Sequence, residues 1–555
     1  MLTRCICTSF TMLLFCFAHP TEARDSSPQY RVIIDSDAKN EIDDQYTIAY
    51  ILKHPQLRVL GINATQFARP GSVQESYEEI KKILDLMDLT DRVPVFRGAE
   101  HALADRKTPQ PSEAAEFIID QARKSTEKLY IVALGALTNV ASAYLLAPDI
   151  ADRVELYWLG GSFWPGGGRE FNAENDPRAL QVTMESPLSV HLIPAHGVGG
   201  LLGLSFNEAK RHLEHTEPVG DFLVERFRQI GDASRAIWDL SAPALLLHPE
   251  WGHQIEARAP TVTNDLEYLP NPNGKIIHVF TDLDADTILD DFFSRFPRPV
   301  KSAPLEIVGA SCVEADHEVL VEFSHFLDRQ TAEDAQNYSI SGVEILAARL
   351  SGDRTKVLLT TSSHEAGKTY DLRVEGVADI AKEPSVIPKG SSVTYQYFPS
   401  FGRGAKCEFY QFDEPLFDFP DIVAKKPDYV GTFSTVSFPY TLGKLRHTEF
   451  LENFVLRCSG YVQVSEDLPH TYWVESTGGV RLRIGKVQIF GKRPQSSTLA
   501  LAAKVQLPKG VHRFTLEYIP NHRIHTLLFY WHLPHGHPTL VPETHLFHDL
   551  EAGAN

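Results

Sequence analysis

The chain has 555 residues, with 43% hydrophobic and 10% aromatic side chains, and a formal net charge of -19 at pH 7. This length predicts two to four domains, and the composition is that of globular protein, which excludes a disordered or fibrous chain. The negative charge argues against a nucleic-acid polymer or an anionic membrane surface as partner, because both are bound through basic patches, and it favours a small neutral substrate.

The N-terminus has the pattern of a secretory signal peptide. Arg4 is followed by an almost uncharged stretch from Cys5 to Ala18, and residues 21–23 (Thr-Glu-Ala) place small side chains at the two key positions of a cleavage site. The stretch is too short to span a membrane, and no other segment of the sequence approaches a transmembrane length. We therefore expect residues 1–23 to be removed and the mature protein to be exported, to the periplasm or the extracellular space.

Removal of this segment leaves three of the six cysteines, Cys312, Cys407 and Cys458. Three cysteines form no disulfide framework. Either Cys407 and Cys458 form a single bridge within the C-terminal region, as an oxidising compartment allows, or all three are buried thiols.

Short apolar runs alternate with helical patterns between about Tyr30 and Phe296. Strands are predicted for runs such as RVIID, LRVLGINA and KLYIVALG, and helices for DQYTIAYILKH, SYEEIKKILDLM and EAAEFIIDQARK between them. This alternation predicts βαβ units, and hence an α/β fold with a mostly parallel open sheet and helices on both faces. We assign residues 28–298 to this domain.

The character of the chain changes after PRPVKSAP (297–304). Residues 303–398 contain short alternating strands such as EVLVEF, TKVLLTT and TYDLRVEGV, separated by turn residues, which predicts a β-sandwich. A Gly-rich joint, SFGRGAKC, leads into residues 404–548, which are again rich in predicted strands and form the second all-β domain.

Four aspartates gather where the first predicted strand stops, in RVIIDSDAKNEIDD (31–44): Asp35, Asp37, Asp43 and Asp44. The carboxyl end of a strand is the edge where open α/β sheets place their ligands. Carboxylates crowded this closely repel one another unless they are protonated or share a cation, and an all-oxygen set suits Ca²⁺ or Mg²⁺. Turn chemistry followed by acids at a helix N-terminus explains one or two of these residues but not four, so the segment predicts a metal site.

Three further segments follow in order: IVALGALTNVA (131–141), GGS with REFNAENDPRAL (160–162 and 169–180), and IWDLSAPALLL (237–247). Together with the opening motif they resemble the nucleoside hydrolase family of the inosine/uridine-preferring type, over about residues 30–297. The resemblance implies a Ca²⁺-dependent enzyme that hydrolyses the N-glycosidic bond of ribonucleosides to ribose and free base. Any one motif is weak, and four in the same order are specific.

The resemblance also implies a metal-binding set and a catalytic base. Asp37, Asp44 and Asp239 match the side-chain Ca²⁺ ligands, and the backbone carbonyl of Leu134 matches a further ligand. Asp37 also matches the general base that takes a proton from the attacking water.

The resemblance implies that Asp43, Glu170 and Asn172 hold ribose hydroxyls. Trp238 is a further substrate-binding candidate from its own chemistry, because an indole can stack on a purine. Several negative groups around the ribose favour the positive charge that develops in an oxocarbenium-like transition state. The same field repels phosphate, so free nucleosides are favoured over nucleotides as substrates.

Other polar residues of these motifs have predicted structural roles. We expect Asp35 to hold its loop through backbone hydrogen bonds, and Thr138 and Asn139 to cap the helix that they begin. Asp176 before Pro177 has the pattern of a helix N-cap with proline in the first position.

Two departures from the family pattern leave the substrate open. Trp238 stands where these enzymes often carry a histidine that assists the leaving base, and the loop between Asp37 and Asp43 is two residues longer than usual. Because tryptophan donates no catalytic proton at neutral pH, the base preference, and the choice between a nucleoside and another riboside, stay open. Two alternatives remain: a phosphatase of the haloacid-dehalogenase type, which also opens with Asp-x-Asp, and a non-catalytic cell-surface carbohydrate-binding protein.

The two later regions resemble modules of exported proteins. Residues 303–398 look like a bacterial immunoglobulin-like domain, and residues 404–548 are similar to the protective-antigen-type β-domain. The latter resemblance implies either a structural or surface-attachment module, which is favoured, or a domain that binds a surface glycan. Ser476 and Thr477 stand where an acidic, metal-binding pair would be expected in some members. Several aromatic residues in this region are either core residues or a sugar-stacking platform: Tyr472, Trp473, Phe529, Tyr530 and Trp531.

Overall fold

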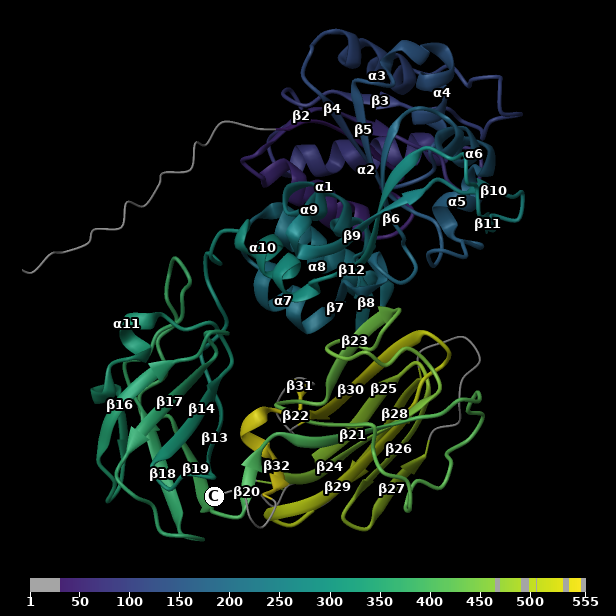
Figure 1. Cartoon of the computed structure of the whole chain (residues 1–555). Helices are drawn as coiled ribbons and strands as arrows, with labels where there is room; N and C mark the ends of the chain where they lie inside the picture. Colours follow the sequence, from purple (N-terminus) through teal and green to yellow (C-terminus); the bar gives the residue numbers. More distant parts are fainter. Residues whose placement is uncertain (1–29, 465–469, 491–498, 506, 533–538, 551–555) are drawn as a thin grey trace, which may run out of the picture.

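The computed structural model describes residues 30–464, 470–490, 499–505, 507–532 and 539–550. The predicted signal peptide, residues 1–23, lies outside this range. Three regions follow one another along the chain, first an α/β region and then two regions built mainly of strands (Figure 1). Within the described residues, no helix is both long enough and apolar enough to cross a membrane.

The first region contains an eight-stranded sheet with the order β3-β2-β1-β4-β5-β6-β12-β9. Each neighbouring pair from β3 to β12 is parallel, and β9 is antiparallel to β12, so the expected mostly parallel sheet is confirmed. The strands are β1 (Tyr30–Ser36), β2 (Leu57–Ala64), β3 (Val95–Arg97), β4 (Leu129–Ala133), β5 (Val154–Leu159), β6 (Ser189–Ile193), β9 (Gly252–Arg258) and β12 (Ile276–Leu283).

Helices cover both faces of this sheet because successive strand residues point to opposite sides. Ile33 of β1 packs in one core and its neighbours Val32 and Ile34 pack in the other. The helices on the Ile33 side are α3 (Glu113–Arg123), α4 (Thr138–Leu146) and α6 (Pro177–Glu185). The helices on the other side are α1 (Asp43–Lys53), α2 (Ser72–Leu86), α8 (Pro218–Ile230), α9 (Ser241–Leu247) and α10 (Ala285–Ser294).

Short elements complete the first region, mostly in the connections beyond the sheet. They are α5 (Phe171–Asn175), α7 (Phe206–Leu213), β7 (Gly203–Ser205), β8 (Ser234–Ala236), β10 (Thr261–Val262), β11 (Tyr268–Leu269), and the 3₁₀ turns η1 (Pro148–Ile150), η2 (Gly199–Leu201), η3 (Trp238–Leu240) and η4 (Pro249–Trp251). The antiparallel pair β7–β8 and the turn η3 matter most below, because Arg235 of β8 interacts with Asp43 and η3 contains Asp239.

The second region has seven strands in the order β15-β18-β19-β13-β14-β17-β16, around one apolar core. The pairing is antiparallel except between β13 and β19. The elements are β13 (Ile307–Val313), β14 (Glu318–Phe323), α11 (Arg329–Ala332), η5 (Ala335–Asn337), β15 (Tyr338–Ile340), β16 (Ile345–Leu350), β17 (Lys356–Thr361), β18 (Thr369–Val374) and β19 (Ser392–Phe398).

The third region has two antiparallel sheets that share one core. One follows the order β20-β32-β24-β29-β26-β27, with β21 paired to β24 and β22 to β21, and the other follows β23-β30-β25-β28, with β31 on β30. The elements are β20 (Phe401–Arg403), β21 (Ala405–Gln411), β22 (Tyr429–Phe433), β23 (Ser437–Leu442), β24 (Phe454–Val464), β25 (His470–Ser476), β26 (Gly479–Ile484), β27 (Val487–Phe490), β28 (Leu499–Val505), β29 (Gly510–Ile519), β30 (Ile524–His532), β31 (Thr539–Leu540), η6 (Glu543–His545) and β32 (Leu546–Asp549).

Two alternatives left open by the sequence are decided in this third region. Cys407 and Cys458 face each other across β21 and β24 and form a disulfide, whereas Cys312 is a free, buried thiol. Tyr472 and Trp531 belong to the shared core, as Phe529 does, so they form no exposed platform.

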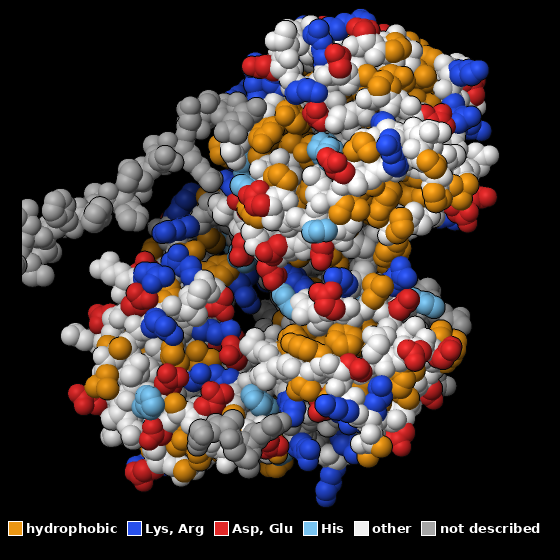
Figure 2. Space-filling view, in the orientation of Figure 1, with side chains coloured by type: hydrophobic (Ala, Val, Ile, Leu, Met, Phe, Trp, Pro, Cys, Tyr) orange, Lys and Arg blue, Asp and Glu red, His pale blue; other side chains and the backbone are white. Residues whose placement is uncertain are grey.

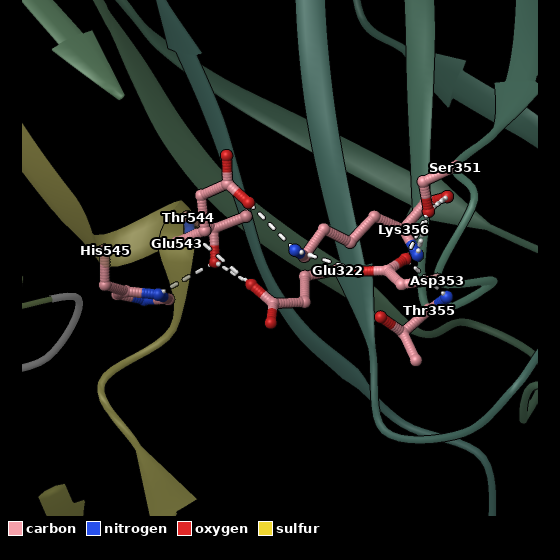
Figure 3. Close-up of polar contacts among 8 residues, drawn as sticks. All are labelled: Glu322, Ser351, Asp353, Thr355, Lys356, Glu543, Thr544 and His545. Atoms are coloured by element: carbon pink, nitrogen blue, oxygen red, sulfur yellow. Dashed lines mark hydrogen bonds and ion pairs between the residues drawn. The ribbon is translucent and has the colours of Figure 1, made fainter. Parts of the chain in front are cut away.

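The second and third regions are joined by a polar contact that Figure 3 shows in detail. Lys356 Nζ of β17 lies 2.8 Å from Glu543 Oε2 of η6, and the hydroxyl of Thr544 donates to Glu322 Oε2 over 3.2 Å. Both members of the ion pair are largely buried, which weakens screening by salt.

Candidate active site

Three buried aspartates bring their carboxylates together at the carboxyl edge of the parallel sheet. Asp43 and Asp44 begin α1, and Asp239 lies in η3, which contacts α1. One oxygen of each lies within 4.8 Å of the other two, and this is the one such group of potential metal ligands among the described residues. Asp37 follows β1 directly and is 1% exposed. It is not one of the three, but its carboxyl is close enough for Asp44 and Asp43 to raise its pKa.

Burial and mutual repulsion make the ionised form of these carboxyls unfavourable when no cation is bound. Burial raises the pKa of Asp44 from 3.8 to about 7. The pKa of Asp37 is raised well above its ordinary value, first by burial and then by repulsion from Asp44 and Asp43. Burial and the neighbouring aspartates act on Asp239 in the same way. Asp44 and Asp239 lie close enough for the pKa of each carboxyl to depend on the other.

The donor set fits a hard divalent cation such as Ca²⁺. Every side-chain donor is a carboxylate oxygen, which is the ligand type that Ca²⁺ and Mg²⁺ take. Asp37 Oδ2 and Asp239 Oδ2 are buried and have no hydrogen-bond partner. An unpartnered buried carboxylate oxygen is unfavourable unless a cation satisfies it. The site therefore has the charge and the unsatisfied oxygens that a bound cation would complete.

The predicted backbone ligand, Leu134, lies where β4 ends. Its carbonyl oxygen accepts a hydrogen bond from Asn172 Nδ2 over 3.0 Å, which leaves a second lone pair for a metal. Its N–H donates to the carbonyl of Asp35 on the neighbouring strand over 2.8 Å, so the two strand ends are fixed to each other.

Gly135 makes room for Asp37. A Cβ at this position would lie 2.9 Å from Asp37 Oδ1 and 2.6 Å from Thr65 Cγ2, closer than real Cβ contacts. Any side chain here would therefore displace the Asp37 carboxyl. The sequence contains this glycine within the second motif, but nothing in the sequence alone indicates its contact with Asp37.

The extended loop after β1 is tied down on both sides. Lys39 Nζ lies 2.6 Å from Glu79 Oε2 of α2, and Arg235 of β8 pairs with Glu41 at 2.5 Å. Arg235 also lowers the pKa of Asp43, against the larger effect of burial. Sequence reasoning did not find Arg235, because a lone arginine carries no motif.

Glu170 and Asn172, which were predicted to bind the sugar, also have structural contacts here. Glu170 caps α5: its carboxylate accepts hydrogen bonds from the N–H groups of Gly161, Asn172 and Ala173. Asn172 Nδ2 donates to the carbonyls of Leu134 and Leu159, which join the ends of β4 and β5. Both residues lie at the carboxyl edge of the sheet, and their binding of a ribose hydroxyl stays a prediction.

Two of the expected structural roles were wrong in detail. Asp35 accepts its hydrogen bonds from the side chains of Asn63 and Asn139, not from the backbone, because both amides point at it from neighbouring elements. Neither Thr138 nor Asn139 caps α4. Thr138 donates to Asp176 instead, and tertiary partners have thus replaced the local cap.

Asp176 is the N-cap of α6, with proline in the first position, as the sequence predicts. Its Oδ1 accepts from the N–H of Ala179 over 2.9 Å. Its Oδ2 accepts from the hydroxyl of Thr138 and from the N–H of Leu103.

Trp238 precedes Asp239 directly and is partly buried. The guanidinium carbon of Arg235 lies 5.6 Å from the centre of its indole ring. Tyr440, from β23 of the third region, contacts the indole edge to face, with ring centres 5.9 Å apart and planes at 70°. The indole is therefore held between two neighbours, one of which comes from another region of the chain.

These features agree with a family comparison, since residues 32–290 match the family described as inosine-uridine preferring nucleoside hydrolase. Residues 32–290 are a nucleoside hydrolase-type domain. The match includes the Asp-x-Asp strand end, Asp35 and Asp37, on which the haloacid-dehalogenase alternative was based. It assigns this motif to the nucleoside hydrolase family and so does not support that alternative.

Relatives of the nucleoside hydrolase-type domain have been described in plants and bacteria. "Probable uridine nucleosidase 2" of Oryza sativa subsp. japonica is 28% identical over 194 residues, which are 29% of this chain and 56% of that protein. "Pyrimidine-specific ribonucleoside hydrolase RihA" of Shigella boydii is 27% identical over 228 residues, 36% of this chain and 66% of that protein. The chain thus spans less than two thirds of the length of these relatives. The solved "Inosine-Guanosine Nucleoside Hydrolase (IG-NH)" is 20% identical, with a TM-score of 0.41 over 48% of this chain and 98% of that one.

Proposed function

We propose that the chain is an exported, Ca²⁺-dependent hydrolase that cleaves the N-glycosidic bond of ribonucleosides to ribose and free base. The observation that carries this proposal is the buried aspartate cluster at the carboxyl edge of the sheet, in a domain that matches the nucleoside hydrolase family. Charge of this density in a buried site is better explained by catalysis with a metal than by folding, because unpaired buried carboxylates destabilise a protein.

The chemistry needs an activated water and a hold on the sugar, because the reaction passes through an oxocarbenium-like cation. Ca²⁺ bound by Asp37, Asp44, Asp239 and the Leu134 carbonyl would supply a polarised water at neutral pH. We assign the general base to Asp37, because one oxygen of its buried carboxylate can bind the cation while the other accepts a proton from the attacking water.

The sugar is held by the acids and amides around this base. Asp43 accepts from a ribose hydroxyl, and Glu170 and Asn172 supply the remaining contacts through lone pairs that their structural hydrogen bonds leave free. The negative charge of the cluster stabilises the developing sugar cation and repels phosphate. Free nucleosides are therefore the proposed substrates rather than nucleotides.

The leaving base has no proton donor at Trp238. The indole can stack on a planar base, and the neighbouring Arg235 keeps its proton at any physiological pH, so neither side chain acts as a general acid. The proposed substrates are consequently ribosides whose leaving group needs little proton donation from the protein. A substrate panel measures which bases meet this condition.

The test is ribose release from a nucleoside panel by the full chain, with Ca²⁺ and with EDTA. We expect release with Ca²⁺, and a loss of at least about 100-fold in Asp37→Asn, because general-base catalysis contributes on this scale. Asp152→Asn, at an exposed position of the same domain, is the matched control and should retain full activity. Absence of release from every nucleoside would refute the proposal and would favour the non-catalytic carbohydrate-binding alternative.

Export is proposed from the predicted signal peptide at residues 1–23. The Cys407–Cys458 disulfide supports it, because such bonds persist in oxidising compartments and are rare in a reducing cytosol. Mass spectrometry of the protein secreted by an expression host would show a mature chain that begins near residue 24, and an intact N-terminus on the secreted protein would refute the cleavage.

For the later regions we propose an immunoglobulin-like β-sandwich at residues 303–398 and a protective-antigen-type β-domain at 404–548 with a surface glycan as ligand. The two sheets that share a core in the third region support the second assignment. Trp473 stacks on Tyr530 with ring centres 5.2 Å apart, and it is the one residue of the five candidate aromatics that is partly exposed and so available for a sugar. A glycan array probed with the full chain and with Trp473→Ala tests this ligand.

A further inference from the structure

The third region reaches the edge of the sheet that carries the aspartates. Its strand β23 packs against β7, β8 and η2 of the first region, all of which lie beyond that edge (Figure 1). The segment 437–447 therefore occupies the side of the site next to η3, where Trp238 and Asp239 lie.

The backbone of β23 makes hydrogen bonds directly to the first region. The N–H of Tyr440 donates to Ser234 Oγ over 2.6 Å, and the N–H of Gly197 donates to the carbonyl of Leu442 over 2.9 Å. A Cβ at Gly203 would lie 2.1 Å from the carbonyl oxygen of Tyr440, so only glycine permits this approach. The two hydrogen bonds and the close approach at Gly203 show that β23 has a defined position on the first region.

Ion pairs continue the contact at its outer side. Lys444 Nζ lies 3.4 Å from Asp282 Oδ2, Arg446 pairs with Asp286, and Arg446 also donates to the carbonyl of Gly203 over 2.6 Å. Figure 2 shows charged side chains of both signs along the junction between the upper and lower parts of the molecule. These pairs fix the direction in which the segment after β23 leaves the site.

This arrangement brings the Tyr440 side chain to the side of the site where Trp238 and Asp239 lie. Its ring contacts the indole of Trp238, whose next residue is the cluster member Asp239. Arg235 lies against the same indole and interacts electrostatically with both Tyr440 and Asp43. A second contact from the third region lies where β5 ends, with the guanidinium of Arg523 4.7 Å from the Phe163 ring centre.

We propose that Tyr440 of the third region completes the base-side wall of the site and, by fixing the indole of Trp238, sets which leaving groups the site accepts. This inference rests on the proposed riboside hydrolysis. Edge-to-face contact restrains the indole plane, and a restrained plane offers a planar leaving group a preformed stacking surface. Tyr440 is thus a positioning residue, supplied by a region that the family match does not include.

The experiment compares Tyr440→Ala, Tyr440→Leu and Tyr440→Phe in the full chain, with Ca²⁺, over a panel of purine and pyrimidine nucleosides. Tyr440→Ala and Tyr440→Leu should raise KM about fivefold to tenfold, by different factors for different bases, with kcat much less affected. Tyr440→Phe should restore the wild-type KM because it retains the ring. Inhibition by free ribose should be the same in all variants, because the ribose end does not depend on Tyr440.

The ribose measurement separates a wall residue from a structural one. If ribose inhibition weakens by the same factor as KM rises, Tyr440 acts on the whole site and the inference is wrong. It is also wrong if Tyr440→Leu folds like the wild type and leaves every KM unchanged. Tyr461→Ala is the matched control, since this ring stacks on Phe401 of β20, away from the first region (Figure 1). A wild-type chain that hydrolyses no riboside refutes the proposed function itself, whereas a catalytically active wild type with an unaltered Tyr440→Ala refutes this inference alone.

Discussion

Replacing Asp44 by asparagine should stabilise the metal-free protein at neutral and higher pH. Asp44 is 2% exposed, and burial raises its pKa from 3.8 to about 7. A shift of this size makes the ionised carboxylate on the order of 4 kcal/mol less favourable in the folded chain than in the unfolded chain. Asparagine retains an oxygen that can accept the hydrogen bond from Ser36 and carries no charge.

The sign of the pH dependence follows from proton binding. Below about pH 4 Asp44 is protonated in both states, so the substitution should have no electrostatic effect there. Between about pH 4 and pH 7 the folded wild type retains the proton that the unfolded chain has released, so its free energy of unfolding falls as pH rises. Above pH 7 both states are ionised, and the full difference of roughly 4 kcal/mol in favour of Asp44→Asn remains. Added Ca²⁺ should narrow this difference, because it stabilises the wild type alone, by about 2.7 kcal/mol at a hundred times its Kd, and should cancel it at about a thousand times its Kd, where the gain is about 4.1 kcal/mol.

The assay is urea unfolding at about pH 4.5 and pH 8, with EDTA and with Ca²⁺, followed by tryptophan fluorescence. Four of the six tryptophans, Trp158, Trp164, Trp238 and Trp251, lie in the first region, so this signal follows the domain that contains the cluster. The exposed Asp152→Asn changes charge equally and should stay within about 0.5 kcal/mol of wild type at both pH values. The reasoning would be refuted if metal-free Asp44→Asn were less stable than wild type at pH 8, or if its gain in the free energy of unfolding were equal at both pH values. Either result would show that the ionised Asp44 carboxylate does not destabilise the folded protein.

Two further changes test the position of Asp37 in the site and the contribution of the disulfide to the stability of the third region. Gly135→Ala should lower kcat/KM by roughly 100-fold, because the added Cβ must displace Asp37, and misplacement by about 1 Å has effects of this size. Gly352→Ala is its control, since no atom lies within 4 Å of the added Cβ, and equal activity of the two variants would contradict the contact. Replacing Cys407 and Cys458 together by serine should lower the free energy of unfolding of the third region by ~4 kcal/mol, from a bridge between residues 51 apart. Calorimetry measures this loss, and thiol titration of the denatured, unreduced mature protein should find Cys312 alone.

The fold of the first region could be predicted from sequence because its signals are local and repeated. A run such as Val32-Ile33-Ile34 is buried on both sides of the sheet, and this continuous apolar run is what a strand between two helical layers requires. The first motif then places Asp37 and Asp44 at the carboxyl edge of the sheet, directly after β1. Asp239 follows β8, which is outside that sheet, and it reaches the same place because η3 contacts α1.

The parts of the site that sequence missed depend on contacts between distant segments. Thr138 and Asn139 have the composition of helix caps, yet Thr138 donates to Asp176 and Asn139 donates to Asp35. Tyr440 is more than 200 positions from Trp238 and belongs to a strand whose pattern predicts only a β-domain. Local pattern carries no record of such a partner, so only a three-dimensional structure can show it.

The longer loop after β1 and the tryptophan beside Asp239 are connected through Arg235. Its guanidinium pairs with Glu41 of the loop, lies against the ring of Trp238, and faces Asp43. A loop whose carboxylates repel one another needs restraint. The ion pair between Glu41 and Arg235 provides this restraint, and the Arg235 side chain also lies against Trp238. Because Tyr440 contacts that same indole, the metal loop, the indole and the third region form one continuous set of contacts. The loop extension and Trp238, the two departures from the family pattern, therefore meet at one side chain, Arg235, within a set of contacts that includes Tyr440 of the third region.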